Sequence, residues 1–212
     1  MAKEMKAEYL LSARSVEQFP RDLGFEVAFF GRSNVGKSSL LNTFTGLKKL
    51  AKVSATPGCT REINFFLVNN RYYLVDLPGY GYAKYSKEEQ KRWSDIIMSY
   101  LKLRSKSILG AVILDIRRGV TDLDINLFDI LVENNVRFEI IATKSDKLKK
   151  SELRPFTLKL KSELEALGLE SDIVRFSSET GEGQRELYNL IQKHYLMFKN
   201  KDNSDDEVEE NL

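Results

Sequence analysis

Short apolar runs alternate along the chain with segments whose apolar residues recur every three or four positions. The runs at 25–30 and 108–114 are almost continuously apolar, which is typical of strands that are covered on both faces. The segment 151–168 has helical spacing and ends in glycine, and Thr121 and Asp124 resemble a capping box at the start of another helix. Strands that alternate with helices in this way predict an α/β fold with a mostly parallel sheet.

A predicted hairpin interrupts this alternation. Two short β-type runs, 63–68 and 72–75, are separated by Asn69-Asn70-Arg71, and asparagine tolerates the positive φ of tight turns. The N-terminal extension, residues 1–22, contains an apolar alternation that could pair as a further edge strand. We therefore expect a doubly wound sheet of six strands, with one antiparallel edge strand and helices on both faces.

The charges divide the chain into a basic body and an acidic tail. Its 212 residues include 33 Lys and Arg and 31 Asp and Glu, for a net charge of +2. Six of the acids and none of the bases lie at 202–212, so residues 1–201 carry 33 bases against 25 acids. We expect one domain at 23–199 and a disordered tail at 200–212, which has too few apolar residues to offset the entropy cost of ordering. A basic body is compatible with RNA or ribosome binding, although a solvated lysine-rich surface is the commoner meaning of such a surplus.

Cysteine content and hydropathy bear on the compartment. Cys59 is the only cysteine, which excludes an internal disulfide and favours a reducing compartment. Residues 1–11 are charged and mixed, unlike a secretory signal, and no later stretch has the roughly 20 apolar residues that a membrane span needs. The sequence therefore predicts a cytoplasmic protein without a membrane segment.

A glycine-rich motif follows the first apolar strand. Residues 31–38 have the pattern G-x-x-x-x-G-K-S and lie between the strand at 25–30 and a helix-like stretch at 39–44. The glycines let the backbone curl so that N–H groups face a phosphate at the positive end of the helix, while Lys37 reaches the outer phosphates and Ser38 ligates magnesium. In this context a chance glycine-rich turn is disfavoured, but the motif alone does not decide between ATP and GTP. The residues expected around the phosphates are Gly31, Arg32, Ser33, Asn34, Val35, Gly36, Lys37 and Ser38.

A second motif ends the predicted strand at 72–75. Asp76-Leu77-Pro78-Gly79 places a carboxylate where it can hold a magnesium-bound water, and a glycine whose N–H can meet the γ-phosphate. Alone, this tetrapeptide would be interpreted as an ordinary Pro-Gly turn. Together with the glycine-rich motif it predicts a site for a triphosphate and its metal ion.

A third motif selects the base. Thr143-Lys144-Ser145-Asp146 follows the predicted strand at 136–142. A carboxylate in that place accepts two hydrogen bonds from guanine N1–H and its exocyclic amine, which adenine cannot offer because its N1 is an acceptor. The aliphatic stem of Lys144 would cover the ring, and Phe176-Ser177-Ser178 is the expected place for N–H groups that meet guanine O6. The motif is weak as a tetrapeptide, but its spacing from Lys37 makes GTP the better prediction.

Taken together, these motifs resemble the Ras-like GTPases of the translation-factor class, and more narrowly the EngB family of ribosome-biogenesis GTPases. The resemblance spans about residues 20–198. It is carried by residues 31–40, Thr56-Pro57-Gly58-Cys59-Thr60 with Asn64-Phe65, residues 76–83 and Asp115-Ile116-Arg117-Arg118-Gly119. The most specific piece is Leu77-Pro78-Gly79-Tyr80-Gly81-Tyr82-Ala83.

The resemblance implies roles for residues that the motifs alone do not assign. Thr60 would join Ser38 in the magnesium shell, with Asp76 acting through a water, and Gly58 and Cys59 would line the nucleotide beside Thr60. Residues 47–62 would form switch I and residues 77–90 switch II. The catalytic groups would be Lys37, Thr60 and Gly79.

The resemblance also implies partners. The EngB family is implicated in assembly of the large ribosomal subunit, and in bacteria its loss disturbs division and septation. The implied partner is a ribosomal subunit or its precursor, through rRNA and ribosomal proteins. We expect the protein to act as a monomer.

One position departs from the Ras pattern. In Ras a glutamine just after the Asp-x-x-Gly motif orients the attacking water, whereas here Tyr80 follows Gly79. We therefore expect slow hydrolysis of GTP to GDP and phosphate. Our hypothesis is that K⁺, with Asn34 as a ligand as in related potassium-dependent GTPases, supplies positive charge at the phosphates. The alternative is a near-inactive G domain that uses nucleotide only to set its shape while it binds ribosomal precursors.

Overall fold

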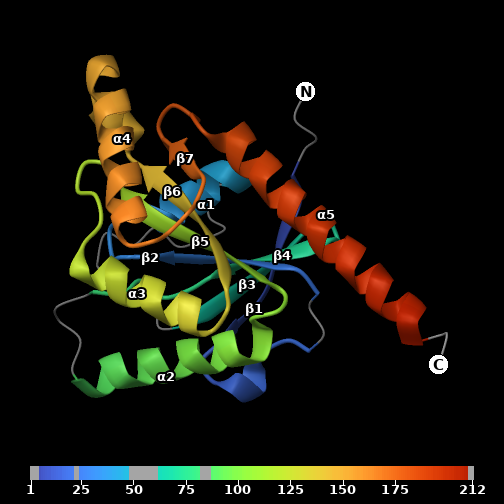
Figure 1. Ribbon diagram of the computed structural model, residues 1–212. Helices are drawn as coiled ribbons and strands as arrows, with labels where there is room; N and C mark the ends of the chain where they lie inside the picture. The colour runs from blue at the N-terminus through green and yellow to red at the C-terminus, as the bar shows by residue number, and fades with distance from the viewer. Residues whose placement is uncertain (1–4, 22–23, 48–61, 82–86, 210–212) are drawn as a thin grey trace.

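The computed structural model describes residues 5–21, 24–47, 62–81 and 87–209, and it is built on one seven-stranded sheet (Figure 1). The strand order is β1-β3-β4-β2-β5-β6-β7. The strands are β1 (Ala7–Ala13), β2 (Glu26–Gly31), β3 (Ile63–Val68), β4 (Tyr72–Asp76), β5 (Ile108–Asp115), β6 (Arg137–Thr143) and β7 (Ile173–Phe176). The predicted α/β class and mostly parallel sheet are confirmed. The sheet has seven strands instead of six because residues 7–13 pair with β3.

Antiparallel pairing is confined to one end of the sheet. β3 pairs antiparallel with β4 and with β1, whereas β4, β2, β5, β6 and β7 pair in parallel. The predicted turn joins β3 to β4, and its residues Asn69 and Asn70 have positive φ values of 50° and 53°. The edge strand is therefore β1, which has a register shift between Tyr9 and Leu11.

Helices cover both faces of the sheet (Figure 1). The α-helices are α1 (Lys37–Thr45), α2 (Lys87–Arg104), α3 (Asp122–Glu133), α4 (Lys150–Ala166) and α5 (Gln184–Glu209), and the short 3₁₀ helices are η1 (Val16–Gln18) and η2 (Ser145–Lys147). One core lies under α2, α3 and α4 and includes Tyr100, Phe128 and Leu164; the other lies under α1 and α5 and includes Leu41 and Ile191. None of the helices in the described ranges is long and apolar enough to cross a membrane.

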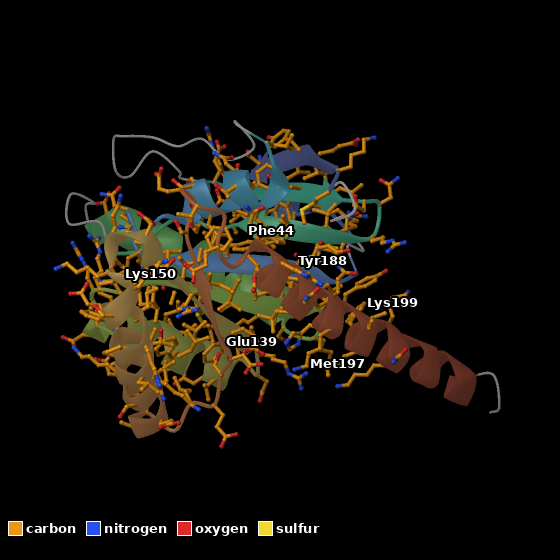
Figure 2. The ribbon with its side chains drawn as sticks, turned by 90° about the horizontal axis from the view of Figure 1, so that it is seen from above. Phe44, Glu139, Lys150, Tyr188, Met197 and Lys199 are labelled. Carbon is orange, nitrogen blue, oxygen red and sulfur yellow. The ribbon has the colours of Figure 1, made fainter. Side chains whose placement is uncertain are left out.

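The last helix continues into the acidic segment. α5 ends at Glu209, so part of the segment at 200–212, which the sequence predicted to be a disordered tail, is helical. Residues 199–209 contain no glycine or proline to stop an established helix, which can therefore propagate. Figure 2 shows Tyr188, Met197 and Lys199 along this helix, whose C-terminal part extends away from the sheet.

The predicted capping box at the start of α3 is confirmed. Thr121 N–H and its hydroxyl donate to Asp124 Oδ2 at 2.9 and 2.7 Å. This contact fixes where α3 begins, beside the carboxyl ends of the parallel strands.

Glu26, at the start of β2, is a fully buried carboxylate at the end of the sheet opposite the glycine-rich motif. The Tyr100 hydroxyl donates to Glu26 Oε2 at 2.9 Å, and Arg104 Nε lies 3.4 Å from Oε1. Burial raises the pKa of Glu26 from 4.5 to about 7, and Arg104 and Tyr100 only partly oppose this rise. The folded state therefore favours the protonated carboxyl.

We expect Glu26→Gln to flatten the pH dependence of stability. Because the folded-state pKa of Glu26 is raised, its stabilising contribution is complete below about pH 4.5 and is lost as the pH rises through about 7. Between pH 5 and 8 the wild type should lose about 2 to 3 kcal/mol of unfolding free energy that the variant keeps. Urea denaturation at both pH values measures this difference. Glu133→Gln, at an exposed position of α3, is the control, and equal pH dependence in wild type and Glu26→Gln would refute the assignment.

Candidate functional site

The glycine-rich motif forms the loop between β2 and α1. Gly31 ends β2 and Lys37 begins α1. Two positions require glycine: a Cβ at Gly31 would lie 2.8 Å from Val35 Cγ1, and Gly36 has a left-handed φ of 106°. Among the described residues no side chain caps α1, and its first turn contains no acid. The positive end of the helix therefore faces the loop, as anion binding requires.

A buried ion pair lies beside this loop. Asp76 ends β4 next to β2, and its carboxylate contacts the ammonium of Lys37; the two side chains are 3% and 8% exposed. Ser38 follows Lys37 in the first turn of α1. The ammonium suits phosphate oxygens, and the hydroxyl and carboxylate are oxygen donors of the kind that Mg²⁺ prefers. The residues present thus fit a triphosphate with its magnesium ion.

The segment after β4 lies against the loop. Ser33 N–H donates to Tyr80 O at 3.0 Å, and Tyr80 N–H donates to Gly31 O at 3.3 Å. Gly79 is so close to the loop that an added Cβ would lie 3.2 Å from Ser33 N. The structure therefore places Gly79 beside the phosphate loop, and its contact with a γ-phosphate stays a prediction.

Several predicted contact residues direct their side chains into the protein. Val35, Leu77 and Phe176 belong to the two cores, and Pro78 is also buried. The side chain of Arg32 is directed at the start of α3, where its Nε lies 3.4 Å from Asp124 Oδ1. These residues could contact a nucleotide only through their main-chain groups, or, for Arg32, after its side chain leaves this carboxylate.

The base motif is tied directly to the phosphate loop. Thr143 Oγ1 donates to Val35 O at 2.7 Å and to Leu114 O at 3.0 Å. Lys144 has a left-handed φ of 63°, and its Nζ donates to Asn34 O at 2.8 Å. Residues more than 100 positions apart in the sequence thus form one unit, which holds the predicted base motif and the predicted phosphate loop in a fixed relation.

Two carboxylates that the sequence did not assign hold this base loop in place. Lys144 Nζ lies 3.0 Å from Asp115 Oδ2, and Ser145 Oγ donates to Glu182 Oε2 at 2.7 Å. Burial alone would raise the pKa of Asp115, but hydrogen bonds from Arg117 and Lys144 outweigh it and lower the pKa to about 2. Asp115 could have been assigned this supporting role from its position at the end of a strand. Glu182 lies in no sequence motif, so the sequence alone did not indicate its contact with Ser145.

Asp146, the carboxylate predicted to recognise the base, is held by two neighbouring side chains. Ser177 Oγ donates to Asp146 Oδ1 at 2.8 Å, and Lys147 Nζ lies 3.1 Å from Oδ2. Burial opposes ionisation of Asp146, but the bonds from Ser177 and Lys147 outweigh it and lower its pKa. Ser178 lies next to this contact, and its carbonyl accepts a hydrogen bond from Thr43 Oγ1 at 3.3 Å. Asp146 is therefore an oriented, ionised acceptor with Ser177 and Ser178 beside it.

The remaining predicted site residues, Gly58, Cys59 and Thr60, lie outside the described residues, as does most of switch I at 47–62. Their contacts with nucleotide and magnesium stay predictions.

A phosphate loop with a buried Lys–Asp pair, joined to an oriented carboxylate for guanine, defines the class of P-loop GTPases. The family model of the 50S ribosome-binding GTPases matches residues 26–144. A probable GTP-binding protein EngB of Natranaerobius thermophilus is 45% identical over 190 residues, which cover 90% of this chain and 98% of that protein. The corresponding protein of Clostridium kluyveri is 45% identical over 187 residues, covering 88% and 94%. The chain therefore belongs to the EngB family of GTP-binding proteins.

Solved structures agree with this assignment. The crystal structure of a probable GTP-binding protein EngB matches with a TM-score of 0.62 at 27% identity, covering 81% of this chain and 99% of that one. The G domain of the Thermotoga maritima iron transporter FeoB matches with a TM-score of 0.52 at 30% identity, covering 81% and 98%. As a member of a GTPase family, the chain binds GTP and GDP. Magnesium, when bound, would neutralise phosphate charge, and the ammonium of Lys37 would contribute a second positive charge at the phosphates.

Proposed function

We propose that the protein is a GTP-controlled switch that binds the large ribosomal subunit or its precursor during assembly. The observation that carries the switch is the single unit formed by Asp146, Lys144 and the phosphate loop, which suits simultaneous recognition of guanine and triphosphate. The ribosomal partner is supported by the matching family of 50S ribosome-binding GTPases and by the excess of basic residues at 1–201. In this proposal the protein is a cytoplasmic monomer that uses Mg²⁺.

In the proposed GTPase cycle, the presence or absence of the γ-phosphate determines the conformation of the switch segments. GTP and magnesium would order the switch segments at 47–62 and 77–90, and hydrolysis would release them. Ribosome binding would thereby depend on the nucleotide. Failure of large-subunit assembly would in turn limit growth, division and septation in a bacterial cell.

Co-sedimentation tests this proposal. The full chain is mixed with separated ribosomal subunits in the presence of a non-hydrolysable GTP analogue, GDP or no nucleotide. We expect it to pellet with the large subunit in one nucleotide state much more than in the others, and Asp146→Asn to lose the dependence on guanine nucleotide. Equal pelleting in all states, or binding to the small subunit alone, would rule the proposal out.

A near-inactive binding module is the second candidate, and the surroundings of Tyr80 favour it. The Tyr80 side chain is 8% exposed and its hydroxyl donates to Asp124 at 2.7 Å, so it is not free to orient an attacking water. Single-turnover GTP hydrolysis in K⁺, with and without ribosomal subunits, separates the two candidates. A rate that stays near zero in every condition supports the module, and stimulation by the subunit supports the switch.

We predict that Asn34 contributes to a potassium effect on hydrolysis. Asn34 is an exposed residue of the phosphate loop with a φ of 65°, so its side-chain amide can be removed with least strain by Asn34→Gly. Wild type should hydrolyse GTP faster in K⁺ than in Na⁺, and the variant should lose most of that difference while keeping its GDP affinity. Asn34→Ala removes the same amide but is a less suitable variant, because alanine is strained at this φ. Equal K⁺ stimulation in wild type and Asn34→Gly would eliminate the hypothesis.

A further inference from the structure

The start of α3 contains a fully buried carboxylate that does more than cap its helix. Asp124 Oδ2 accepts the capping-box bond from Thr121 N–H and a second bond from the Thr121 hydroxyl. Its other oxygen, Oδ1, accepts a 2.7 Å hydrogen bond from the Tyr80 hydroxyl and lies 3.4 Å from Arg32 Nε. A helix cap needs only the first oxygen. The second oxygen instead joins the phosphate loop, through Arg32, to the residue that follows Gly79.

Tyr80 is anchored at both its side chain and its main chain. Burial and the neighbouring Asp124 raise the pKa of Tyr80, so its hydroxyl stays protonated and donates. The same residue makes the two main-chain bonds to the loop, from Ser33 N–H and to Gly31 O. With the aromatic ring held by Asp124, residues 79–80 are fixed against the phosphate loop.

This arrangement competes with a γ-phosphate. The N–H of Ser33, a residue of the phosphate loop, is occupied by Tyr80 O, and Gly79 is packed directly on Ser33. An incoming γ-phosphate needs the loop donors and the Gly79 N–H, so these contacts must rearrange when GTP binds. GDP has no γ-phosphate and makes no such demand. A ligand that requires a minor conformation binds more weakly by the fraction of molecules in that conformation.

We propose that Asp124 is a positioning residue that sets the discrimination between GDP and GTP. Through Tyr80 it holds residues 79–80 on the phosphate loop, and this lowers the affinity for GTP while leaving the affinity for GDP unchanged. Arg32 strengthens the hold because it is attracted to the same carboxylate oxygen. The inference rests on the GTP site described above, but it concerns binding alone and does not depend on a ribosomal partner.

Tyr80→Phe tests this proposal because it removes one hydroxyl and keeps the packed ring. A hydrogen bond to a charged group contributes enough that its loss should shift the ratio of GDP to GTP-analogue dissociation constants about tenfold towards the triphosphate. Titration with fluorescent nucleotides measures both constants on the full chain with magnesium. In the nucleotide-free protein, amide hydrogen exchange of the peptides containing Ser33 and Tyr80 should become faster.

Thr121→Ala is the matched control. It removes the capping hydroxyl from Asp124 Oδ2 and leaves the Tyr80 bond to Oδ1, so it should lower stability without moving the affinity ratio. Asp124→Asn should shift the ratio in the same direction as Tyr80→Phe, because it loses the charge that attracts Arg32. An unchanged ratio in Tyr80→Phe, weaker GTP-analogue binding, or an equal shift in Thr121→Ala would overturn the proposal. The ribosome assay can fail without affecting this result, since only purified protein and nucleotide are used.

Discussion

Asp146→Asn is expected to lower the affinity for GTP by about two to four orders of magnitude. Guanine offers two donors, N1–H and the exocyclic amine, and the carboxylate of Asp146 can accept both, whereas an asparagine amide places a donor against one of them. The mismatch also leaves buried polar groups without partners, which is the costly outcome for a hydrogen-bonding site. Ser177 can still donate to the amide oxygen, so the loop itself should keep its shape.

The same change should create affinity for xanthosine nucleotides. Xanthine has a carbonyl where guanine has its exocyclic amine, and the asparagine amide can donate to that oxygen. Titration of wild type and variant with GDP and xanthosine diphosphate measures the exchange of preference. Asp129→Asn, at an exposed position of α3, is the control and should change neither affinity. Retained GDP affinity in Asp146→Asn would show that Asp146 does not contact the base.

The positions of the site motifs were predictable because the fold brings strand ends together. The phosphate loop begins at the end of β2, Asp76 ends β4 and Thr143 ends β6, and parallel strands present their carboxyl ends at one edge of a sheet. The hydrogen bond from Thr143 to Val35 is the observed result of that rule. Local patterns were sufficient here, since each motif carries its own strand and turn signals.

Other features depend on contacts that no local pattern contains. β1 pairs with β3 across 50 to 61 residues, from Ala13↔Ile63 to Ala7↔Val68, and with a register shift, so its seven residues gave only a weak signal. Asp124 was predicted as a helix cap, but its second role requires Tyr80 and Arg32 to arrive from two other loops. Glu182 likewise gains a role only when Ser145 comes within 2.7 Å. These are tertiary contacts between residues far apart in the sequence. Each residue is of a common type for its local position, so no local pattern indicates the contact.

Lys37→Met is expected to destabilise the protein even without nucleotide. Lys37 and Asp76 form an ion pair whose side chains are 8% and 3% exposed, and removing the cation leaves a buried carboxylate uncompensated. Loss of one partner of such a pair costs about 3 kcal/mol or more. The variant should also gain little thermal stability from GDP with magnesium, because the ammonium that meets the phosphates is gone.

A second change separates the two effects. In Lys37→Met/Asp76→Asn the buried charge is removed as well, so the unfolding free energy in urea should recover most of the loss, while stabilisation by GDP should stay absent. Wild type, both single variants and the double variant form a thermodynamic cycle whose coupling energy reports the pair. A coupling near zero, or a Lys37→Met variant as stable as wild type, would mean that solvent rather than Lys37 compensates Asp76. A strong coupling would instead show that Lys37 and Asp76 stabilise each other in the folded protein. Asp76 would then be the partner that allows the predicted phosphate-binding lysine to stay buried in the absence of nucleotide.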